Sequence, residues 1–256
     1  MNLKAAVQNP EPSQPEWNPY ESLAAQLERA KEELELVSYV TSHDLNAPLR
    51  AILDACEELG SNAAIAADRE ASAGLHKITN NAGHMKILMQ GLLDYLRLET
   101  FGPAHSLLDM NEIVAAAQTI LEEKIRATGA RITCDSLPQF YGHRGRMTRL
   151  FVSLIENALK FHSAEQAEIH ISAQLSGTNL EFLVKDNGIG IDEEYHTIIF
   201  NLFQRLHTEA EYPGYGIGLA LSRKIVESHS GRIWVESALE KGSSFRFILP
   251  MRKPKN

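Results

Sequence analysis

Apolar residues recur at alternating spacings of three and four along two stretches of the N-terminal half. The first stretch covers residues 23–59 and the second covers residues 75–96, with turn residues between them at 60–70. A narrow apolar stripe of this kind is typical of a coiled-coil seam, so the pattern predicts two long helices joined as a hairpin. The second seam consists of Leu75, Ile78, Ala82, Met85, Met89, Leu92 and Leu96.

A hairpin of two helices cannot bury such a stripe alone. We therefore expect it to pair with a second copy of the chain in a four-helix bundle, as a homodimer. Three consecutive steps of four fall between Val37 and Leu49 and interrupt the heptad, and His43 lies in this stutter, off the seam. The second helix is expected to end near Glu99, before the sequence Phe-Gly-Pro at 101–103.

After Pro103 the pattern changes to mixed α and β. Residues 109–128 and 144–161 have helical spacing, whereas four later segments alternate with period two. These segments pair into two predicted hairpins, 168–175 with 180–186 and 231–237 with 243–249. The predicted fold class is α+β, with an N-terminal antiparallel helical hairpin followed by a sheet that carries helices on one face.

Four prolines within residues 10–19 favour an extended leader over residues 1–20. We expect a helical domain over 21–102, an α/β domain over 103–250 and a tail over 251–256.

The composition argues against a membrane-spanning protein, a nucleic-acid-binding protein and a fold held by disulfides or zinc. The chain has 256 residues, of which 44% are hydrophobic and 23% charged, and no apolar run approaches the length of about 20 residues that crosses a membrane. Its formal net charge of −8 argues against nucleic acid as a partner. The two cysteines, Cys56 and Cys134, cannot build a disulfide framework or a four-ligand zinc site, and the start of the chain lacks a secretory signal. We expect a cytoplasmic protein without a membrane span.

The first candidate site is the sequence SHDLNAPLR at residues 42–50. His43 is placed on the outer face of the first helix, and Asp44 beside it can take a proton from the ring, so that the other ring nitrogen becomes nucleophilic. Pro48 removes a backbone hydrogen bond one turn later. The alternative interpretation is an ordinary solvated histidine on an amphipathic helix.

The second candidate is SLIENALKFH at residues 153–162. Asn157 offers a hard oxygen of the kind that Mg²⁺ prefers, and Lys160 offers a point charge for phosphate. The alternative is an amphipathic helix with one polar residue in its apolar stripe.

Two glycine-rich segments follow. In VKDNGIGID, at residues 184–192, Asp186 ends a strand beside a backbone that can approach a ligand closely, and its carboxylate can accept the amine of a base. The D-N-G sequence alone is also common in hairpin turns. In the second segment, Gly214, Gly216 and Gly218 precede an apolar helix, whose free amides and positive end can hold phosphate.

Together these motifs resemble, in order and spacing, the transmitter module of sensor histidine kinases, and most closely the module of bacterial phytochromes. The resemblance covers residues 21–250. It implies a dimerisation and phosphoacceptor domain followed by an α/β sandwich similar to the ATPase domain of gyrase, heat-shock protein 90 and mismatch-repair proteins.

The resemblance also implies roles for individual residues. In the phosphoacceptor box, His43 would be phosphorylated and Asp44 would be its general base. In the asparagine box, Asn157 would bind Mg²⁺, Lys160 phosphate and Phe161 the nucleotide. The glycine boxes and the phenylalanine box FNLFQRL (200–206) would supply the other positions: Asp186 for the adenine amine, Gly188 and Gly190 to shape the pocket, Arg205 for the γ-phosphate, and Gly214, Gly216 and Gly218 beside a mobile lid.

The implied function is ATP-dependent autophosphorylation of a histidine with Mg²⁺, followed by transfer to an aspartate of a response regulator receiver domain. An upstream sensory domain or protein would supply the signal. Movement of the catalytic domain about residues 100–108 would control the rate, because phosphoryl transfer depends on positioning. Two alternatives remain: a nucleotide-binding scaffold that heterodimerises with another kinase, and an ATPase of the same fold that drives conformational change.

Three positions depart from the family pattern. Ser153 stands where the family often has a second asparagine, which predicts weaker nucleotide or metal binding. Tyr215 stands where a small threonine is usual. Ala47 stands where many members carry a Thr or Asn that helps water attack the phosphorylated regulator, and because alanine forms no side-chain hydrogen bond, we expect weak phosphatase activity.

Overall fold

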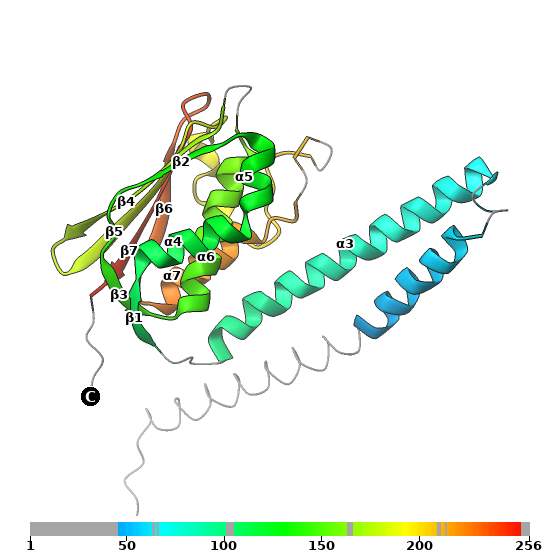
Figure 1. Ribbon diagram of the computed structural model, residues 1–256, viewed down its shortest axis with the longest axis horizontal. Coiled ribbons are helices and arrows are strands. Elements are labelled where there is room, and N and C mark those ends of the chain that lie inside the picture. Colours follow the sequence, from blue (N-terminus) through cyan, green and yellow to red (C-terminus); the bar gives the residue numbers. More distant parts are fainter. Residues whose placement is uncertain are drawn as a thin grey trace, which may run out of the picture.

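A computed structural model describes the chain over residues 46–62, 65, 67–100, 105–162, 166–208, 211–212 and 214–251. The expectations for His43, Asp44 and the leader lie outside these residues. Figure 1 shows a helical arm beside an α/β body. This arrangement confirms the predicted fold class of N-terminal helices followed by an α/β sandwich.

The arm contains a helix at residues 46–60 and the long helix α3 (Arg69–Thr100). Asp68 begins α3, because its Oδ1 accepts the backbone N–H groups of Glu70 and Ala71 at 2.9 and 3.1 Å. The helices lie together at the turn, where a Cβ on Gly60 would be 3.5 Å from Cδ2 of Leu75. None of the described helices is long and apolar enough to cross a membrane.

The seam of α3 is only partly buried within one chain. Ala82 is 5% exposed, whereas Ile78, Met85 and Leu92 are 53%, 54% and 37% exposed. Ile52 and Leu59 of the preceding helix are also exposed. The described part of the arm, residues 46–62 and 67–96, therefore has several exposed apolar side chains along one seam.

The body is built on a mixed sheet. Its five strands are β2 (Arg131–Cys134), β4 (Glu168–Ser176), β5 (Asn179–Asp186), β7 (Ser243–Pro250) and β6 (Arg232–Ser237), in that spatial order. The pair β2–β4 is parallel and the other pairs are antiparallel. A separate antiparallel pair joins β1 (Ser106–Asp109) to β3 (Gln139–Gly142). The two predicted hairpins are confirmed as β4–β5 and β6–β7.

Helices cover one face of this sheet (Figure 1). They are α4 (Met110–Ile120), α5 (Glu122–Thr128), α6 (Arg144–Lys160) and α7 (Gly218–Ser228), and two short 3₁₀ helices, η1 (Glu193–Tyr195) and η2 (Ile198–Phe200), precede α7. The single helix predicted over 109–128 is interrupted at Leu121, which is buried and donates its N–H to the carbonyls of Ala117 and Gln118. The predicted helix at 144–161 is confirmed.

The core lies between the helices and the sheet. Phe151 of α6 contacts Phe182 of β5 and Phe247 of β7, with ring centroids 6.2 and 5.8 Å apart. All three side chains are fully buried. This packing fixes α6 against the sheet, so the polar residues at the end of α6 face the end of β5.

Candidate functional site

A large cavity opens between the end of α6, the end of β5, the start of α7 and the arm. Its volume is about 1210 Å³, which is ample for a nucleotide. It brings together nearly all the candidates of the body, namely Asn157, Lys160, Phe161, Asp186, Gly190, Arg205, Gly214, Gly216 and Gly218. Gly188 is not among the lining residues, but its N–H binds the carboxylate of Asp186, which is.

Asp186 is the buried carboxylate of this cavity. Its side chain is 7% exposed, and its Oδ1 accepts the N–H groups of Gly188 at 2.9 Å and Ser243 at 3.0 Å. Burial raises the pKa of Asp186, and the two backbone hydrogen bonds oppose that rise. Two fixed donors on Oδ1 orient the carboxyl group, so that Oδ2 is the oxygen available to a donor on a ligand.

The two glycines after Asp186 allow close backbone contacts. A Cβ on Gly188 would lie 2.4 Å from the carbonyl oxygen of Phe161. Gly190 has φ +75°, and its Cβ would lie 2.0 Å from the carbonyl oxygen of Ala238. Ile189 donates its N–H to Phe161 at 2.9 Å, so this turn joins the end of α6 to the end of β5.

Asn157 and Ser153 are one turn apart on α6 and both line the cavity. Asn157 Nδ2 and Ser153 Oγ are buried and have no hydrogen-bond partner among the described residues. Buried polar groups are normally satisfied, so these two are suited to bind a ligand. The amide of Asn157 also offers the type of oxygen that Mg²⁺ accepts, and the site therefore fits a magnesium–nucleotide complex.

Aromatic residues line the end of α6. Tyr212 and His207 pack near the ring of Phe161, with centroid distances of 4.9 and 5.8 Å, and Lys160 Nζ lies 4.4 Å from the centroid of Phe161. Burial, followed by the nearby positive charge of Arg205, lowers the pKa of Lys160. The sequence motifs did not identify His207 or Tyr212, because their part in the cavity depends on how the loop folds back.

The glycines at the start of α7 let other parts of the cavity wall approach the backbone closely. A Cβ on Gly214 would lie 2.7 Å from Lys160 Nζ, and a Cβ on Gly218 would lie 2.7 Å from Ser153 Oγ. Gly216 has φ +69° and tightly contacts the backbone of Gln204. Ile217, the N-cap residue of α7, makes no side-chain cap, so the first amides of this helix are suited to an anion.

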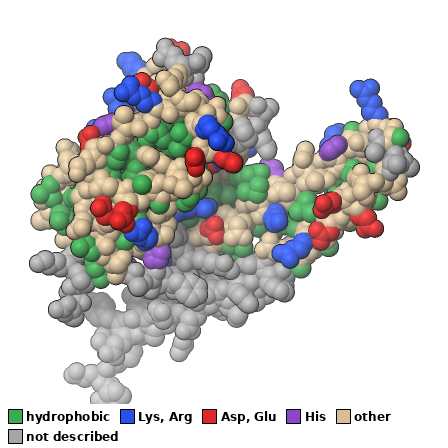
Figure 2. All heavy atoms as spheres, viewed as in Figure 1, with side chains coloured by type: hydrophobic (Ala, Val, Ile, Leu, Met, Phe, Trp, Pro, Cys, Tyr) green, Lys and Arg blue, Asp and Glu red, His purple; other side chains and the backbone are tan. Residues whose placement is uncertain are grey.

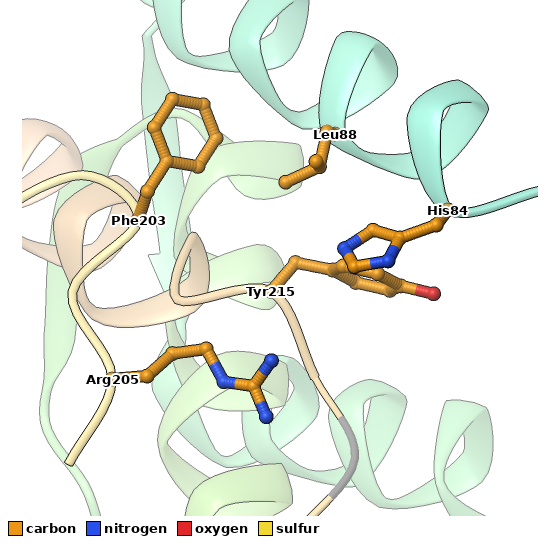
Figure 3. A pocket seen from close by; sticks show the side chains of 5 residues that line it. All are labelled: His84, Leu88, Phe203, Arg205 and Tyr215. Carbon is orange, nitrogen blue, oxygen red and sulfur yellow. The ribbon is translucent and has the colours of Figure 1, made fainter. Parts of the chain in front are cut away.

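Arg205 connects this cavity to the arm. Its Nη2 donates to the carbonyl oxygen of Tyr212 at 3.2 Å. Figure 3 shows His84 and Leu88 reaching from α3 toward Phe203, Arg205 and Tyr215, around a second cavity of about 220 Å³.

The arm contacts the body at three further places along α3. A Cβ on Gly91 would lie 2.2 Å from Cδ1 of Ile217, so the helix and the start of α7 approach closely here. Asp94 Oδ2 lies 3.6 Å from Arg149 Nη2, and Lys224 Nζ lies 4.1 Å from the ring centroid of Tyr95. Figure 2 shows hydrophobic side chains gathered where the arm meets the body.

The α/β sandwich and its nucleotide-sized cavity are of the kind found in histidine kinase- and HSP90-like ATPase domains, and comparison with known proteins agrees. A family model described as "Histidine kinase-, DNA gyrase B-, and HSP90-like ATPase" matches residues 142–253. Cyanobacterial phytochrome A of Nostoc sp. is 39% identical over 229 residues, which cover 90% of this chain and 30% of that protein. The adaptive-response sensory kinase SasA of Thermosynechococcus vestitus is 31% identical, with 90% and 64% covered.

Solved structures share the fold. Full-length ShkA in complex with AMPPNP superposes with a TM-score of 0.65 and 21% identity, over 86% of this chain and 46% of that chain. The histidine kinase ThkA in complex with the response regulator protein TrrA gives a TM-score of 0.59 and 21% identity, over 90% and 66%.

The chain belongs to the histidine kinase family, and its resemblance to the kinase modules of phytochromes is confirmed. It spans about 30% of the length of the phytochrome relatives.

Proposed function

We propose that the chain is an ATP-dependent protein histidine autokinase of a two-component system. The observation that carries this proposal is the convergence in one cavity of a buried carboxylate, an amide nitrogen with no partner in the described part of the chain, and two cationic side chains. These residues are Asp186, Asn157, Lys160 and Arg205. This donor and acceptor set suits a base at one end and a triphosphate at the other. Within the chain, the division into a phosphoacceptor domain at 21–102 and a catalytic domain at 103–250 belongs to the same proposal.

The base is held at the β5 end of the cavity. Asp186 Oδ2 accepts the exocyclic amine of adenine, because Oδ1 already accepts two backbone N–H groups. Gly188 and Gly190 let the backbone approach the base, and Phe161 contributes an apolar wall.

The triphosphate lies toward α7 and the arm. Lys160 and Arg205 supply positive charge, and the first turn of α7 supplies amides beside Gly214, Gly216 and Gly218. Asn157 is the residue that would hold Mg²⁺, which when bound screens the charge of the phosphates.

The transfer step joins the two domains. One ring nitrogen of His43 attacks the γ-phosphorus, a P–N bond forms as the bond from γ-phosphorus to the bridging oxygen breaks, and ADP leaves. Asp44 takes the proton from the other ring nitrogen. The phosphoryl group then passes from His43 to a carboxylate of the receiver aspartate, and the histidine is regenerated.

Dimerisation, the upstream sensor and the cytoplasmic location are part of this proposal. The exposed seam residues Ile78, Met85 and Leu92 support a homodimer, because pairing with a second hairpin would bury them. An upstream sensory domain or protein would act on the arm, and the response regulator would dock beside His43.

Turnover of ATP by His43→Gln separates the proposal from its alternatives. A histidine kinase loses protein phosphorylation in this variant but still binds ATP. If the variant hydrolyses ATP at the rate of the unmodified chain, the ATPase alternative is correct. If the unmodified chain binds ATP without any turnover, the scaffold alternative is correct.

A further inference from the structure

Three histidines from three elements meet close to the point where the chain passes from the arm to the body. His105 directly precedes β1, His143 is the N-cap of α6, and His229 is the C-cap of α7. The rings of His105 and His229 are 5.5 Å apart, and the backbone nitrogen of His143 is 3.4 Å from Nε2 of His229. We call these three residues the histidine clasp.

The hydrogen bonds of His229 fix its protonation state. Its side chain is 8% exposed, and its Nδ1 lies 2.8 Å from the carbonyl oxygen of Ile225. A carbonyl only accepts, so Nδ1 carries the hydrogen, and Nε2 is left to accept the N–H of His143. A proton added to Nε2 would face that N–H, so protonation and this hydrogen bond exclude each other.

His143 is constrained in the same way. Its Nδ1 accepts the backbone N–H of Arg146 at 3.0 Å and so caps the first turn of α6. A proton on Nδ1 removes the cap. The rings of His143 and His229 therefore each use a lone pair to bind a backbone amide, and both amides lie where β3 turns into α6.

The groups around the clasp add positive charge. His105, His143 and Arg146 act on the ring of His229, and Tyr141 of β3 stacks on His105 at 6.1 Å. Arg144 is paired with Glu112 of α4 at 2.6 Å. Burial is the main cause that lowers the pKa of His229 and of His143, and the positive charge of Arg146 lowers both further.

We propose that the histidine clasp is a proton-sensitive latch at the entry to the body. When the rings of His143 and His229 are neutral, the hydrogen bond between the two residues holds the end of α7 against the β3–α6 turn, and the ring of His105 at the start of β1 packs on that of His229. Acidification charges the rings of His143 and His229, breaks the two backbone hydrogen bonds and loosens the end of α7 from the β3–α6 turn. The start of β1 then loses the fixed ring of His229 against which His105 packs, which changes how the body is held relative to α3. The rings of His143 and His229 bind protons less readily when the latch is closed, so the closed state is most populated above about pH 6.5 and its population falls as the pH drops below that value.

The test uses the whole chain and the double variant His143→Asn/His229→Gln. Asparagine is a good N-cap at position 143, and the glutamine oxygen can replace Nε2 as an acceptor, so the variant keeps both hydrogen bonds and loses both titrations.

In the unmodified chain labelled with ¹⁵N-histidine, NMR at about pH 7.5 should show His229 as the tautomer with hydrogen on Nδ1. Between about pH 6.5 and pH 5, the hydrogen-exchange protection of the amides of His143 and Arg146 should fall by up to about tenfold per pH unit for each proton bound. In the double variant, the amides at positions 143 and 146 should lose no more protection over this pH range than reference amides in α4 lose.

Two results would overturn the latch. One is a His229 ring with its hydrogen on Nε2 at neutral pH. The other is an equal loss of protection in the unmodified chain and the variant. The single variant His143→Asn keeps the test valid if the double variant does not fold, since it should lower the pH dependence by one proton.

The effect of the latch on kinase activity is measured separately. The ratio of autophosphorylation rates at about pH 7.5 and pH 5.5 should differ between the unmodified chain and the double variant, and equal ratios would show that the clasp only stabilises the body.

Discussion

The ring of Tyr215 packs against the ring of His84, with centroids 4.6 Å apart and planes inclined by 58°. The two residues come from the segment before α7 and from α3, and they border the same small cavity (Figure 3). The family usually has a small threonine where this chain has Tyr215. The large ring has a partner here, because it reaches across to the arm.

This contact predicts energetic coupling between the two residues. Tyr215→Thr and His84→Ala should each destabilise the chain, and the double variant should be less destabilised than the sum, by a coupling free energy of about 0.5–1.5 kcal/mol. Urea unfolding of the four proteins gives this coupling. Strictly additive effects would mean that the rings do not interact in solution.

Asp186→Asn should weaken ATP binding by about 10- to 150-fold, as expected for loss of a hydrogen bond to a charged group. The asparagine oxygen can still accept the N–H groups of Gly188 and Ser243. Its amide nitrogen then points toward the adenine amine, and because both groups are hydrogen-bond donors they cannot bind each other. Calorimetric titration with ATP measures the change. Asp109→Asn is the matched control, because Asp109 caps α4 away from the cavity and asparagine also caps well.

ATP affinity should also depend on pH through Asp186. Because Oδ1 already accepts two N–H groups, an added proton sits on Oδ2 and faces the amine as a second donor. Affinity is therefore full above the pKa of Asp186 and falls as the pH drops through it. Burial raises that pKa above the ordinary value of 3.8, so the loss begins at a higher pH than for an exposed aspartate. Affinity that rises on acidification would contradict this assignment.

Ser153→Ala should change stability and ATP affinity in opposite directions. The Ser153 hydroxyl is buried and has no partner among the described residues, so its removal should raise the free energy of unfolding of the nucleotide-free protein by about 1 kcal/mol. ATP binding should weaken severalfold, because the hydroxyl lies beside the start of α7, where we place the phosphates. Unfolding without nucleotide and titration with ATP separate the two effects. A variant that is less stable and binds ATP normally would show that the hydroxyl is structural.

Ala47 predicts weak phosphatase activity. It lies exposed on the helix at 46–60, four residues after the proposed phosphoacceptor. The unmodified chain should remove phosphate from a phosphorylated response regulator slowly without ATP, and Ala47→Thr should speed this removal, because threonine can hydrogen-bond an attacking water. Rapid removal by the unmodified chain would refute the prediction.

Strong periodicity made much of the fold predictable. The hairpins β4–β5 and β6–β7 and the long helix α3 follow from patterns that extend over many residues. The strands β1, β2 and β3 were not predicted, because each has four residues and too few alternations to identify. The break between α4 and α5 was also missed, since Leu121 is an ordinary helix former and the interruption is visible only in its backbone hydrogen bonds.

The site was predictable where glycines and polar residues interrupt an apolar pattern, as at Asp186 and Asn157. His207 and Tyr212 could not be identified in this way, because they reach Phe161 only after the loop folds over the end of α6. The contact between His84 and Tyr215 joins residues of two different parts of the chain, and no local pattern indicates it.

The most direct test of the central claim is incubation of the chain with γ-labelled ATP and Mg²⁺, followed by exposure of the labelled protein to acid or base. The proposal predicts label that survives base, is lost in acid and is absent from His43→Gln, because a phosphorus–nitrogen bond on histidine is acid-labile. Label that persists in His43→Gln, or no label although ATP binds, would contradict the assignment of His43 as the phosphoacceptor of an autokinase.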